Sequence, residues 1–469
     1  MLRTIKNTEQ SFLFWILLVF SGVYLTLAFP FSYFRHDDWL ILGNVARFIP
    51  QDWKFLFEPY LFFNTIKEVW FFRPWFKLFV YLNYLVLGFR YYAWLTLNLV
   101  FTVGALVFGY FSLLEFKKEK KHALLFVAFF ISSLHFHFGS LVWVGEGAMN
   151  CPQLFFLFLN FYCFSKSLTA KEKSLQFTWY FLSLLTFMVS LGFKESSIFH
   201  LPFLLALLFH YTPKEKFHLR KFTPLIPFGI VGLFYLYFRL QLLPINQGYK
   251  PQTKIQLMVF PALTLMASLS LPLISLLLSK FLHKQTLQNL LRAITSYLIC
   301  GILFAPFFIA YVGHGFFSPG WLLTPGIYVS FLLGLKWPKT FTDAKVIRLA
   351  LSLNLLLSGS LVAYQTMKIQ WWTWYKPQKQ IVKIIEELGD SNTKRINIFN
   401  CQKPEDSLTP LIRVVGYDVA IQEVFWLKHK TQPKVSILPC TASHRIVAYS
   451  QNNSINLSWS FPEFTIIKN

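Results

Sequence analysis

Long apolar stretches separated by short polar turns recur along most of the chain. A helix needs about 20 mainly apolar residues, within a range of roughly 17 to 25, to cross the hydrocarbon core of a bilayer. Eleven segments are candidates for such helices: 11–30, 91–113, 123–142, 148–165, 178–194, 196–211, 222–240, 257–280, 293–311, 321–336 and 347–366. The pattern predicts an all-α polytopic membrane domain.

The basic residues lie mainly in the turns between these segments. Cytoplasmic turns of membrane proteins carry an excess of Lys and Arg. Eleven alternating crossings place the basic clusters on the side of the N-terminus: Arg3 and Lys6; Lys117, Lys118, Lys120 and Lys121; Lys166, Lys171 and Lys173; Lys214, Lys216, Arg220 and Lys221; Lys280, Lys284 and Arg292; and Lys336, Lys339, Lys345 and Arg348. The opposite turns 143–147 and 312–320 contain no Lys or Arg. The N-terminus is therefore predicted to be cytoplasmic and the C-terminus extracytoplasmic.

The composition excludes two other classes of protein. Hydrophobic residues make up 55% of the chain and charged residues 14%, whereas soluble proteins average roughly 45–50% and 25%. A disordered chain is excluded because disordered segments are poor in aromatic residues, and this one has 55 Phe, 21 Tyr and 15 Trp. The net charge of +23 would suit a nucleic-acid-binding protein, but its placement in the turns argues against a nucleic-acid partner.

Two predicted extracytoplasmic regions are too long to be turns. The first, 31–90, contains the aromatic-rich stretches Trp53–Phe63 and Trp70–Leu87, which suit interfacial helices. The second, 371–469, is richer in polar residues and predicts a small α/β domain that follows a transmembrane domain at 1–370. Its predicted elements are a helix at Gln378–Leu388 and strands at Arg395–Phe399, Val414–Ala420, Val435–Leu438 and Arg445–Ser450.

The five cysteines fall into two groups. Cys151, Cys163 and Cys300 lie in predicted spans, where a thiol suits core packing. Cys401 and Cys440 share the predicted outer domain, and an oxidising compartment would allow them to pair. The sequence leaves open whether they form a disulfide or stay as free thiols.

Ionisable side chains gather at the predicted outer face of the membrane. Such groups are costly to hold near a bilayer, so their positions point to function. The residues concerned are Asp37, Asp38, Glu68, Arg73, Glu146, Lys194, Glu195, Arg239 and His314. A carboxylate can accept a proton from an acceptor hydroxyl, and cationic groups can hold a phosphate. The set predicts an interfacial polar cavity suited to attack on a phosphate-activated headgroup.

Each of these features taken alone also has a structural explanation. An acidic pair is favourable at a helix start, and an Arg before a Pro suits a snorkelling side chain that precedes a helix. The Lys-Glu pair suits a hairpin tip followed by capping serines, and the remaining Arg and His suit an interface anchor and an ordinary loop. Their occurrence at one predicted level of the membrane favours the functional interpretation.

Three local patterns follow one another between residues 10 and 340. They are His36–Trp39 soon after the first span, Phe71–Trp75 in the same loop, and Phe193–Ser196 followed by Pro202. Their order, together with the topology, resembles the GT-C superfamily of integral-membrane glycosyltransferases. The resemblance is to bacterial relatives of the polyprenyl- or dolichyl-phosphate-sugar-dependent protein O-mannosyltransferases. It implies a GT-C-like membrane fold of about eleven helices.

The resemblance also implies roles for single residues. The catalytic base of the first outside loop corresponds to Asp37, with Asp38 as its partner, and the choice between the two acids stays open. Donor-phosphate contacts carry over to Lys194, Arg73 and Arg239. The other candidates for substrate binding are Glu68, Glu146, Glu195 and His314.

Two features depart from the family pattern. The Trp-Trp-Asp motif of oligosaccharyltransferases is not present, since Trp371 and Trp372 are followed by Thr373. The segment 312–322 lacks the Arg-Tyr pair that many relatives carry there.

These observations predict an inverting glycosyltransferase of the bacterial inner membrane. It would move a sugar from a polyprenyl-phosphate donor to a lipid, glycan or protein acceptor on the extracytoplasmic face. Nothing requires a cofactor or metal, although Asp37, Asp38 and Glu146 would suit a divalent cation if they converged. The alternatives are a transporter or flippase of a lipid-linked glycan, which would favour mid-membrane ionisable sites and repeated halves, and a scaffold protein with a vestigial site.

Overall fold

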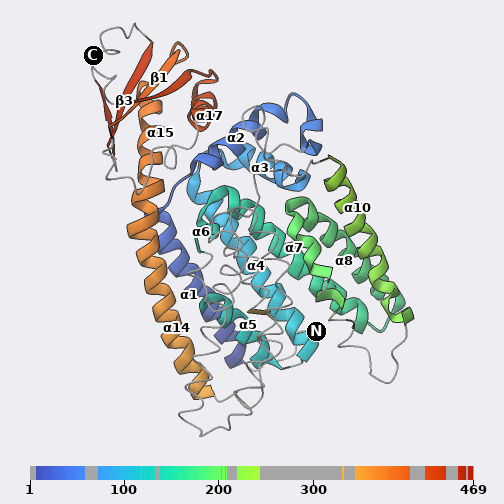
Figure 1. Ribbon diagram of the computed structural model, residues 1–469. Coiled ribbons are helices and arrows are strands. Elements are labelled where there is room, and N and C mark those ends of the chain that lie inside the picture. The colour runs from blue at the N-terminus through green and yellow to red at the C-terminus, as the bar shows by residue number, and fades with distance from the viewer. Residues whose placement is uncertain are drawn as a thin grey trace, which may run out of the picture. The chain divides into compact units, whose positions relative to one another are not determined.

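The chain divides into two compact units in a computed structural model (Figure 1). Unit 1 comprises Met1–Leu25, Thr96–Leu141 and Glu146–Val362, and unit 2 comprises Thr26–Leu95, Val142–Gly145 and Ala363–Asn469. The structure describes residues 7–58, 72–117, 119–132, 138–201, 203–205, 208, 219–242, 330–331, 344–401, 418–439, 453–460 and 463–467.

Unit 1 is built almost entirely from helices. Its elements, some of which continue into unit 2, are α1 (Asn7–Phe31), α4 (Tyr91–Lys117), α5 (Lys120–Ser132), α6 (Phe138–Val142), α7 (Val144–Thr169), α8 (Lys173–Phe193), the 3-10 helices η3 (Glu195–His200) and η5 (Leu219–Leu225), α10 (Ile226–Leu242) and α14 (Ala344–Tyr364). Within the described residues, three segments are long and apolar enough to cross a membrane: Leu13–Phe31, Tyr91–Glu115 and Lys173–Phe193. They coincide with three predicted spans. Those at 257–280 and 293–311 lie outside the described residues.

The surfaces of these helices are those of a membrane protein. On α10, Ile230, Leu233 and Phe234 are 60%, 69% and 63% exposed, and Phe177 on α8 is 71% exposed. Contiguous apolar surface of this kind is rare on soluble monomers and suits contact with lipid tails. The interior is filled by aromatic rings such as Phe158 and Phe161, both almost fully buried.

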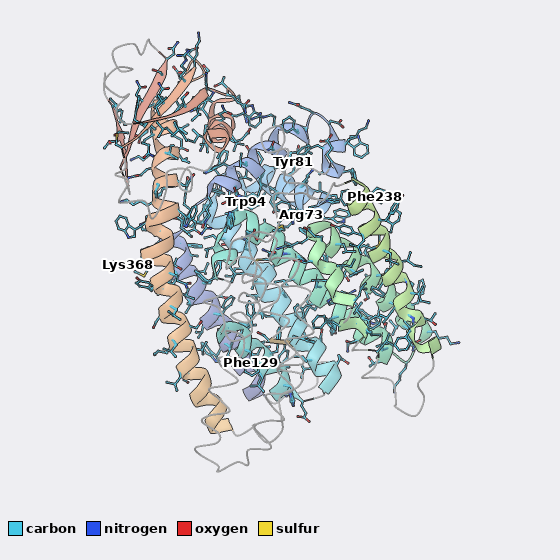
Figure 2. All side chains as sticks on the ribbon, in the orientation of Figure 1. Arg73, Tyr81, Trp94, Phe129, Phe238 and Lys368 are labelled. Carbon is cyan, nitrogen blue, oxygen red and sulfur yellow. The ribbon has the colours of Figure 1, made fainter. Side chains whose placement is uncertain are left out.

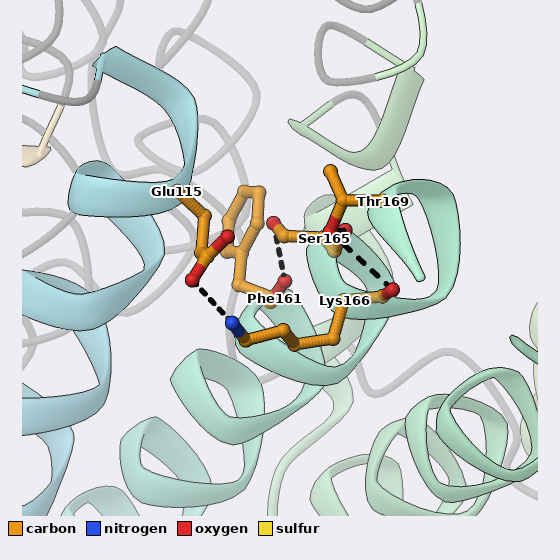
Figure 3. Close-up of polar contacts among 5 residues, drawn as sticks. All are labelled: Glu115, Phe161, Ser165, Lys166 and Thr169. Atoms are coloured by element: carbon orange, nitrogen blue, oxygen red, sulfur yellow. Dashed lines mark hydrogen bonds and ion pairs between the residues drawn. The ribbon is translucent and has the colours of Figure 1, made fainter. Parts of the chain in front are cut away.

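An ion pair joins the C-terminal ends of α4 and α7 (Figure 3). Lys166 Nζ donates to Glu115 Oε1, and the last turns of α7 are closed by Ser165 Oγ, which donates to the Phe161 carbonyl over 2.8 Å. The two helices therefore end on the same side of unit 1. Alternating crossings predict this, because one crossing separates the second span from the fourth.

Unit 2 combines short helices with a four-stranded sheet of order β2-β1-β3-β4 (Figure 1). Its elements are α2 (His36–Phe48), the 3-10 helix η1 (Trp53–Phe57), α3 (Pro74–Leu87), the π-helix η9 (Gln365–Tyr375), α15 (Lys376–Leu388), β1 (Arg395–Asn400), α17 (Asp418–His429), β2 (Lys434–Pro439), β3 (Ser454–Ser460) and β4 (Glu463–Ile466). The strand β1 pairs in parallel with β2 and β3. Parallel neighbours need a crossover, which α17 supplies between β1 and β2.

The predicted elements of the C-terminal region are confirmed in part. The helix at Gln378–Leu388 and the strands at Arg395–Phe399 and Val435–Leu438 are present as α15, β1 and β2. The strand at Val414–Ala420 is wrong where the structure describes it, because Asp418 begins α17. The apolar residues after Asp418 recur with helical spacing and are buried. This longer helical pattern outweighs the short apolar run from which the strand was predicted. The strand at Arg445–Ser450 lies outside the described residues.

The first long loop contains the helix α2, which the sequence suggested only as the structural explanation of the acidic pair. The predicted stretch Trp70–Leu87 is represented by α3, which begins at Pro74, and Trp53–Phe63 by the shorter η1. Proline is favoured at the first position of a helix because its missing N–H would have no partner there.

The cysteines behave differently in the two units. Cys151 and Cys163 are free and buried within α7, as core packing predicts. Cys401, which directly follows β1, is disulfide-bonded. Cys440, the residue with which the sequence allowed it to pair, lies outside the described residues.

Candidate functional site

One carboxylate holds the N-termini of two helices in unit 2. Asp38 lies in the first turn of α2, where its Oδ2 accepts the Arg35 backbone N–H over 2.8 Å. Its Oδ1 accepts the Gly145 N–H over 2.5 Å, in the first turn of α7. The first N–H groups of a helix have no partner within it and favour a negative charge. The helix-start explanation is therefore right for Asp38, although the residue is buried rather than solvated.

Burial changes the acidity of this group. Only 1% of Asp38 is exposed, and burial raises the pKa of its carboxyl group from 3.8 to about 7. The two backbone N–H donors and the nearby Arg35 charge act in the opposite direction, because they favour the carboxylate.

Gly145 allows Asp38 to approach α7 closely. A Cβ on this residue would lie 2.8 Å from Asp38 Oδ1 and 2.9 Å from Ile41 Cδ1, closer than real Cβ contacts. The same position is 3.9 Å from Trp143 Nε1. The Asp38 carboxylate and the Trp143 indole therefore both lie beside the backbone of Gly145.

Beside Asp38, three aromatic rings surround the Arg35 side chain. The guanidinium carbon lies 4.8 Å from the ring centre of Trp143, 5.0 Å from Tyr375 and 5.4 Å from Trp374. Such distances allow cation–π attraction. We call Arg35, Asp38, Trp143, Trp374 and Tyr375 the Arg35 cluster; all five residues belong to unit 2.

Asp37 and Arg73, also in unit 2, differ in accessibility. Asp37 is half-buried, in contrast to Asp38. Arg73, labelled in Figure 2, directly precedes Pro74 at the start of α3, and it is only 5% exposed, unlike a side chain that snorkels to solvent. Both residues make polar or electrostatic interactions of their own.

In unit 1 the predicted site residues enter a hydrogen-bonded network. Glu146 Oε2 accepts from Asn150 Nδ2 over 2.7 Å, and Asn150 Oδ1 accepts from Lys194 Nζ over 2.7 Å. Lys194 follows the last residue of α8 and is 4% exposed. One turn further along α7, Gln153 Nε2 donates to the hydroxyls of two serines in η3, each over 2.9 Å. We call Glu146, Asn150, Gln153, Lys194, Ser196 and Ser197 the Lys194 network.

The other end of α2 is fixed by the C-terminal part of unit 2. Arg47 pairs with Glu423 of α17 over 2.6 Å. A Cβ on Gly43 would lie 2.9 Å from Glu423 Cβ, so glycine permits the close approach of the two helices. Burial raises the pKa of Glu423 from 4.5 to about 7, while Arg47 and Gln432 act to lower it.

The remaining predicted residues are less fully described. Arg239 belongs to α10, but its side chain lies outside the description, as do Glu68 and His314 entirely. Glu195 begins η3 and is half-buried. No group of three or more His, Cys, Asp or Glu among the described residues could hold a metal ion.

Sequence reasoning did not assign roles to Arg35, Trp143 or Tyr375. The only available signal was the position of Arg35 beside the acidic pair. Trp143 and Tyr375 stand more than 100 residues from it, and no local pattern connects them. The same is true of the pair formed by Arg47 and Glu423.

Comparison with known proteins shows a likeness of fold. No family model and no curated protein matches the sequence. The structure is similar to the crystal structure of ArnT from Cupriavidus metallidurans in the apo state, with a TM-score of 0.51 and 8% sequence identity over 96% of this chain and 93% of that one. ArnT is a GT-C glycosyltransferase. The apolar helices fit the same kind of polytopic membrane domain. The chain therefore shares the fold of this ArnT structure.

Proposed function

We propose that this protein is a membrane glycosyltransferase that uses a polyprenyl-phosphate-linked sugar. The observation that carries the proposal is the GT-C type of fold along nearly the whole chain. Acids at the start of α2 and a buried lysine at the end of α8 supply the two kinds of group that such a transfer needs. The acceptor would be a lipid, a glycan or a protein.

Asp37 is the better candidate for the general base. Both oxygens of Asp38 already accept backbone N–H groups, and its side chain is buried. A base must reach the proton that it removes, to within hydrogen-bonding distance. Asp38 then acts as the partner that fixes the start of α2, and with it the position of Asp37.

Lys194 is proposed to hold the donor phosphate, with Arg73 and Arg239 as further cationic contacts. Asn150 and Glu146 would orient the Lys194 ammonium group, because Asn150 bonds to both side chains. Glu68, Glu195 and His314 remain candidates for substrate binding.

In the proposed reaction, Asp37 removes the proton of an acceptor hydroxyl while the hydroxyl oxygen attacks the anomeric carbon of the sugar. The bond between that carbon and the donor phosphate oxygen breaks, and the phosphate leaves with the electron pair on its polyprenyl carrier. Attack opposite to the leaving phosphate inverts the anomeric centre. Cationic side chains stabilise the negative charge that develops on the phosphate.

The topology belongs to the same proposal. Eleven crossings would place residues 371–469 and the proposed site on the extracytoplasmic side of a bacterial inner membrane. A reporter that is active only outside the cytoplasm, fused after Asn469, should be active. Activity of a cytoplasm-specific reporter at the same position would contradict the placement of the site.

The decisive experiment measures release of polyprenyl phosphate from a labelled lipid-linked sugar by the purified protein. We expect Asp37→Asn to lower the transfer rate by about 10²- to 10⁴-fold, the usual contribution of general-base catalysis. Lys194→Ala should chiefly weaken donor binding. The matched control is Asp52→Asn, which changes an exposed acid of the same loop.

Two outcomes would contradict this assignment. A larger loss for Asp38→Asn in protein that remains folded would transfer the role of base to Asp38. Near-normal transfer in both Asn variants would remove the proposed base altogether. A transporter or flippase would move the lipid-linked glycan without releasing polyprenyl phosphate.

A further inference from the structure

The Arg35 cluster contains hydrogen-bond donors that the described part of the chain does not satisfy. Arg35 Nε, Trp143 Nε1 and Tyr375 Oη are buried and make no well-formed hydrogen bond among the described residues; the Tyr375 hydroxyl has the Arg35 side chain as its polar neighbour. Tyr375 is fully buried. Buried polar atoms almost always have hydrogen-bond partners in folded proteins. These three atoms, one in the Arg35 guanidinium and two on rings beside it, therefore need an explanation.

The chemistry of these atoms indicates what is missing. The Arg35 Nε–H and the indole N–H can only donate, and the Tyr375 hydroxyl can donate as well. Asp38, the nearby acid, accepts the backbone N–H groups of Arg35 and Gly145 and does not accept from these three atoms. The cluster therefore lacks a hydrogen-bond acceptor, and the Arg35 charge favours an acceptor that is negatively charged.

We propose that Arg35, Trp143 and Tyr375 form a binding site for an oxyanion, namely a phosphate group. The guanidinium supplies the charge and a planar set of N–H donors, which suits the oxygens of such groups. The rings of Trp143, Trp374 and Tyr375 hold it from several sides, so little side-chain entropy is lost on binding. All of these residues belong to unit 2.

This site differs from the proposed donor contacts at Lys194, Arg73 and Arg239. It does not rest on the proposed transfer, because binding is measurable without a sugar donor. The oxyanion could belong to a lipid headgroup or to a water-soluble molecule. The shared chemistry is that of a phosphate, and two probes separate the sources.

The test uses the full-length protein in detergent and measures binding by calorimetry. The probes are inorganic phosphate and a polyprenyl monophosphate. Tyr375→Phe removes only the hydroxyl, and Trp143→Phe keeps a ring but removes the indole N–H. Each should weaken binding of the responding probe by about 10- to 100-fold, the effect of one hydrogen bond to a charged group.

Two further variants make the result specific. Tyr364→Phe changes an exposed tyrosine and should leave binding unchanged. Lys194→Ala tests the proposed donor contact separately: the loss of phosphate binding caused by Tyr375→Phe should be the same with and without Lys194→Ala, so failure of the two proposals can be told apart. Arg35→Gln should reduce binding most, because it removes the charge.

Each outcome decides the proposal. Binding of both probes, weakened by Tyr375→Phe and Trp143→Phe, supports a general oxyanion site. Binding of the polyprenyl monophosphate alone, with the same response, supports the site and identifies a lipid headgroup. If neither probe binds the wild-type protein, or if both Phe variants bind as tightly as the wild type, the proposal is wrong.

Discussion

The polar group described in unit 1 and the one described in unit 2 differ in how completely their hydrogen bonds are satisfied. In the Lys194 network of unit 1, Asn150, Gln153 and Lys194 each donate to a named partner. In the Arg35 cluster of unit 2, donors on Arg35 and Tyr375 have none within the described residues. A satisfied buried network fixes one arrangement of its helices, whereas an unsatisfied one is costly unless something else completes it.

Asp38 shows that satisfied and unsatisfied hydrogen bonds do not simply divide between unit 1 and unit 2. It belongs to the Arg35 cluster, yet each of its oxygens accepts a backbone N–H group. Its contribution should therefore be to stability, while that of its neighbours Arg35 and Tyr375 should be to binding. Variants can separate these contributions.

The largest effect on stability is expected for Asp38→Asn. The amide can accept one of the two backbone N–H groups, but it turns an N–H donor toward the other. We expect the free energy of unfolding to fall by about 1–3 kcal/mol, the cost of leaving a buried donor unsatisfied. Denaturant unfolding in detergent measures it. Asp37→Asn should change it by less than about 0.5 kcal/mol, and equal losses would show that the two acids do not differ in this way.

A somewhat smaller loss is expected for Gln153→Leu in unit 1. The variant removes the amide that donates to Ser196 and Ser197, and the net value of such bonds is about 1 kcal/mol. A double-mutant cycle with Ser196→Ala isolates the pair. If the cycle shows no coupling, the network does not fix η3 against α7.

The burial of Glu423 beside Arg47 should make stability depend on pH. Because the folded-state pKa of Glu423 is raised from 4.5 to about 7, its contribution is complete below about pH 4.5 and is lost as the pH rises through 7. Melting temperatures should fall over that range, and less steeply in Glu423→Gln. Part of the slope should remain, because Asp38 shifts in the same direction. An unchanged slope in the variant would exclude Glu423 as a source.

The smallest effect on stability is expected for Tyr375→Phe, which loses a hydroxyl without a partner in the described structure. The free energy of unfolding measured without added phosphate should stay within about 0.5 kcal/mol of the wild type. Tyr180→Phe is the matched control, since its hydroxyl donates to the Pro224 carbonyl over 2.8 Å, and it should cost about 1 kcal/mol. Equal costs for both variants would mean that the Tyr375 hydroxyl has a partner.

Features that depend on long apolar runs could be predicted from the sequence. The spans represented by α1, α4 and α8 follow from length and hydropathy alone. The short strands were harder, because a few apolar residues suit either a strand or a helix. Residues 418–420 began a helix, and β3 was not predicted although Ile455 and Leu457 alternate with polar residues and are buried.

The candidate site was predictable only where charge stands out in an apolar sequence. Asp38, Lys194 and Glu146 were identified in this way, and all three occupy polar clusters. The surroundings of Arg35 depend on Trp143 and Tyr375, which are distant in sequence and common in this aromatic-rich chain. Only packing shows which of the 15 Trp and 21 Tyr matter.

The contact of Arg47 with Glu423 also has a consequence for biosynthesis. The two residues are 376 positions apart, so α2 leaves the ribosome long before α17 exists. At a synthesis rate of about 5–20 residues per second, α2 must wait roughly 20 to 75 seconds for its partner. During that time the face that carries Gly43 and Arg47 has not yet met α17. A translation product that stops before residue 418 would retain α2 but never acquire this contact, however complete its membrane helices are.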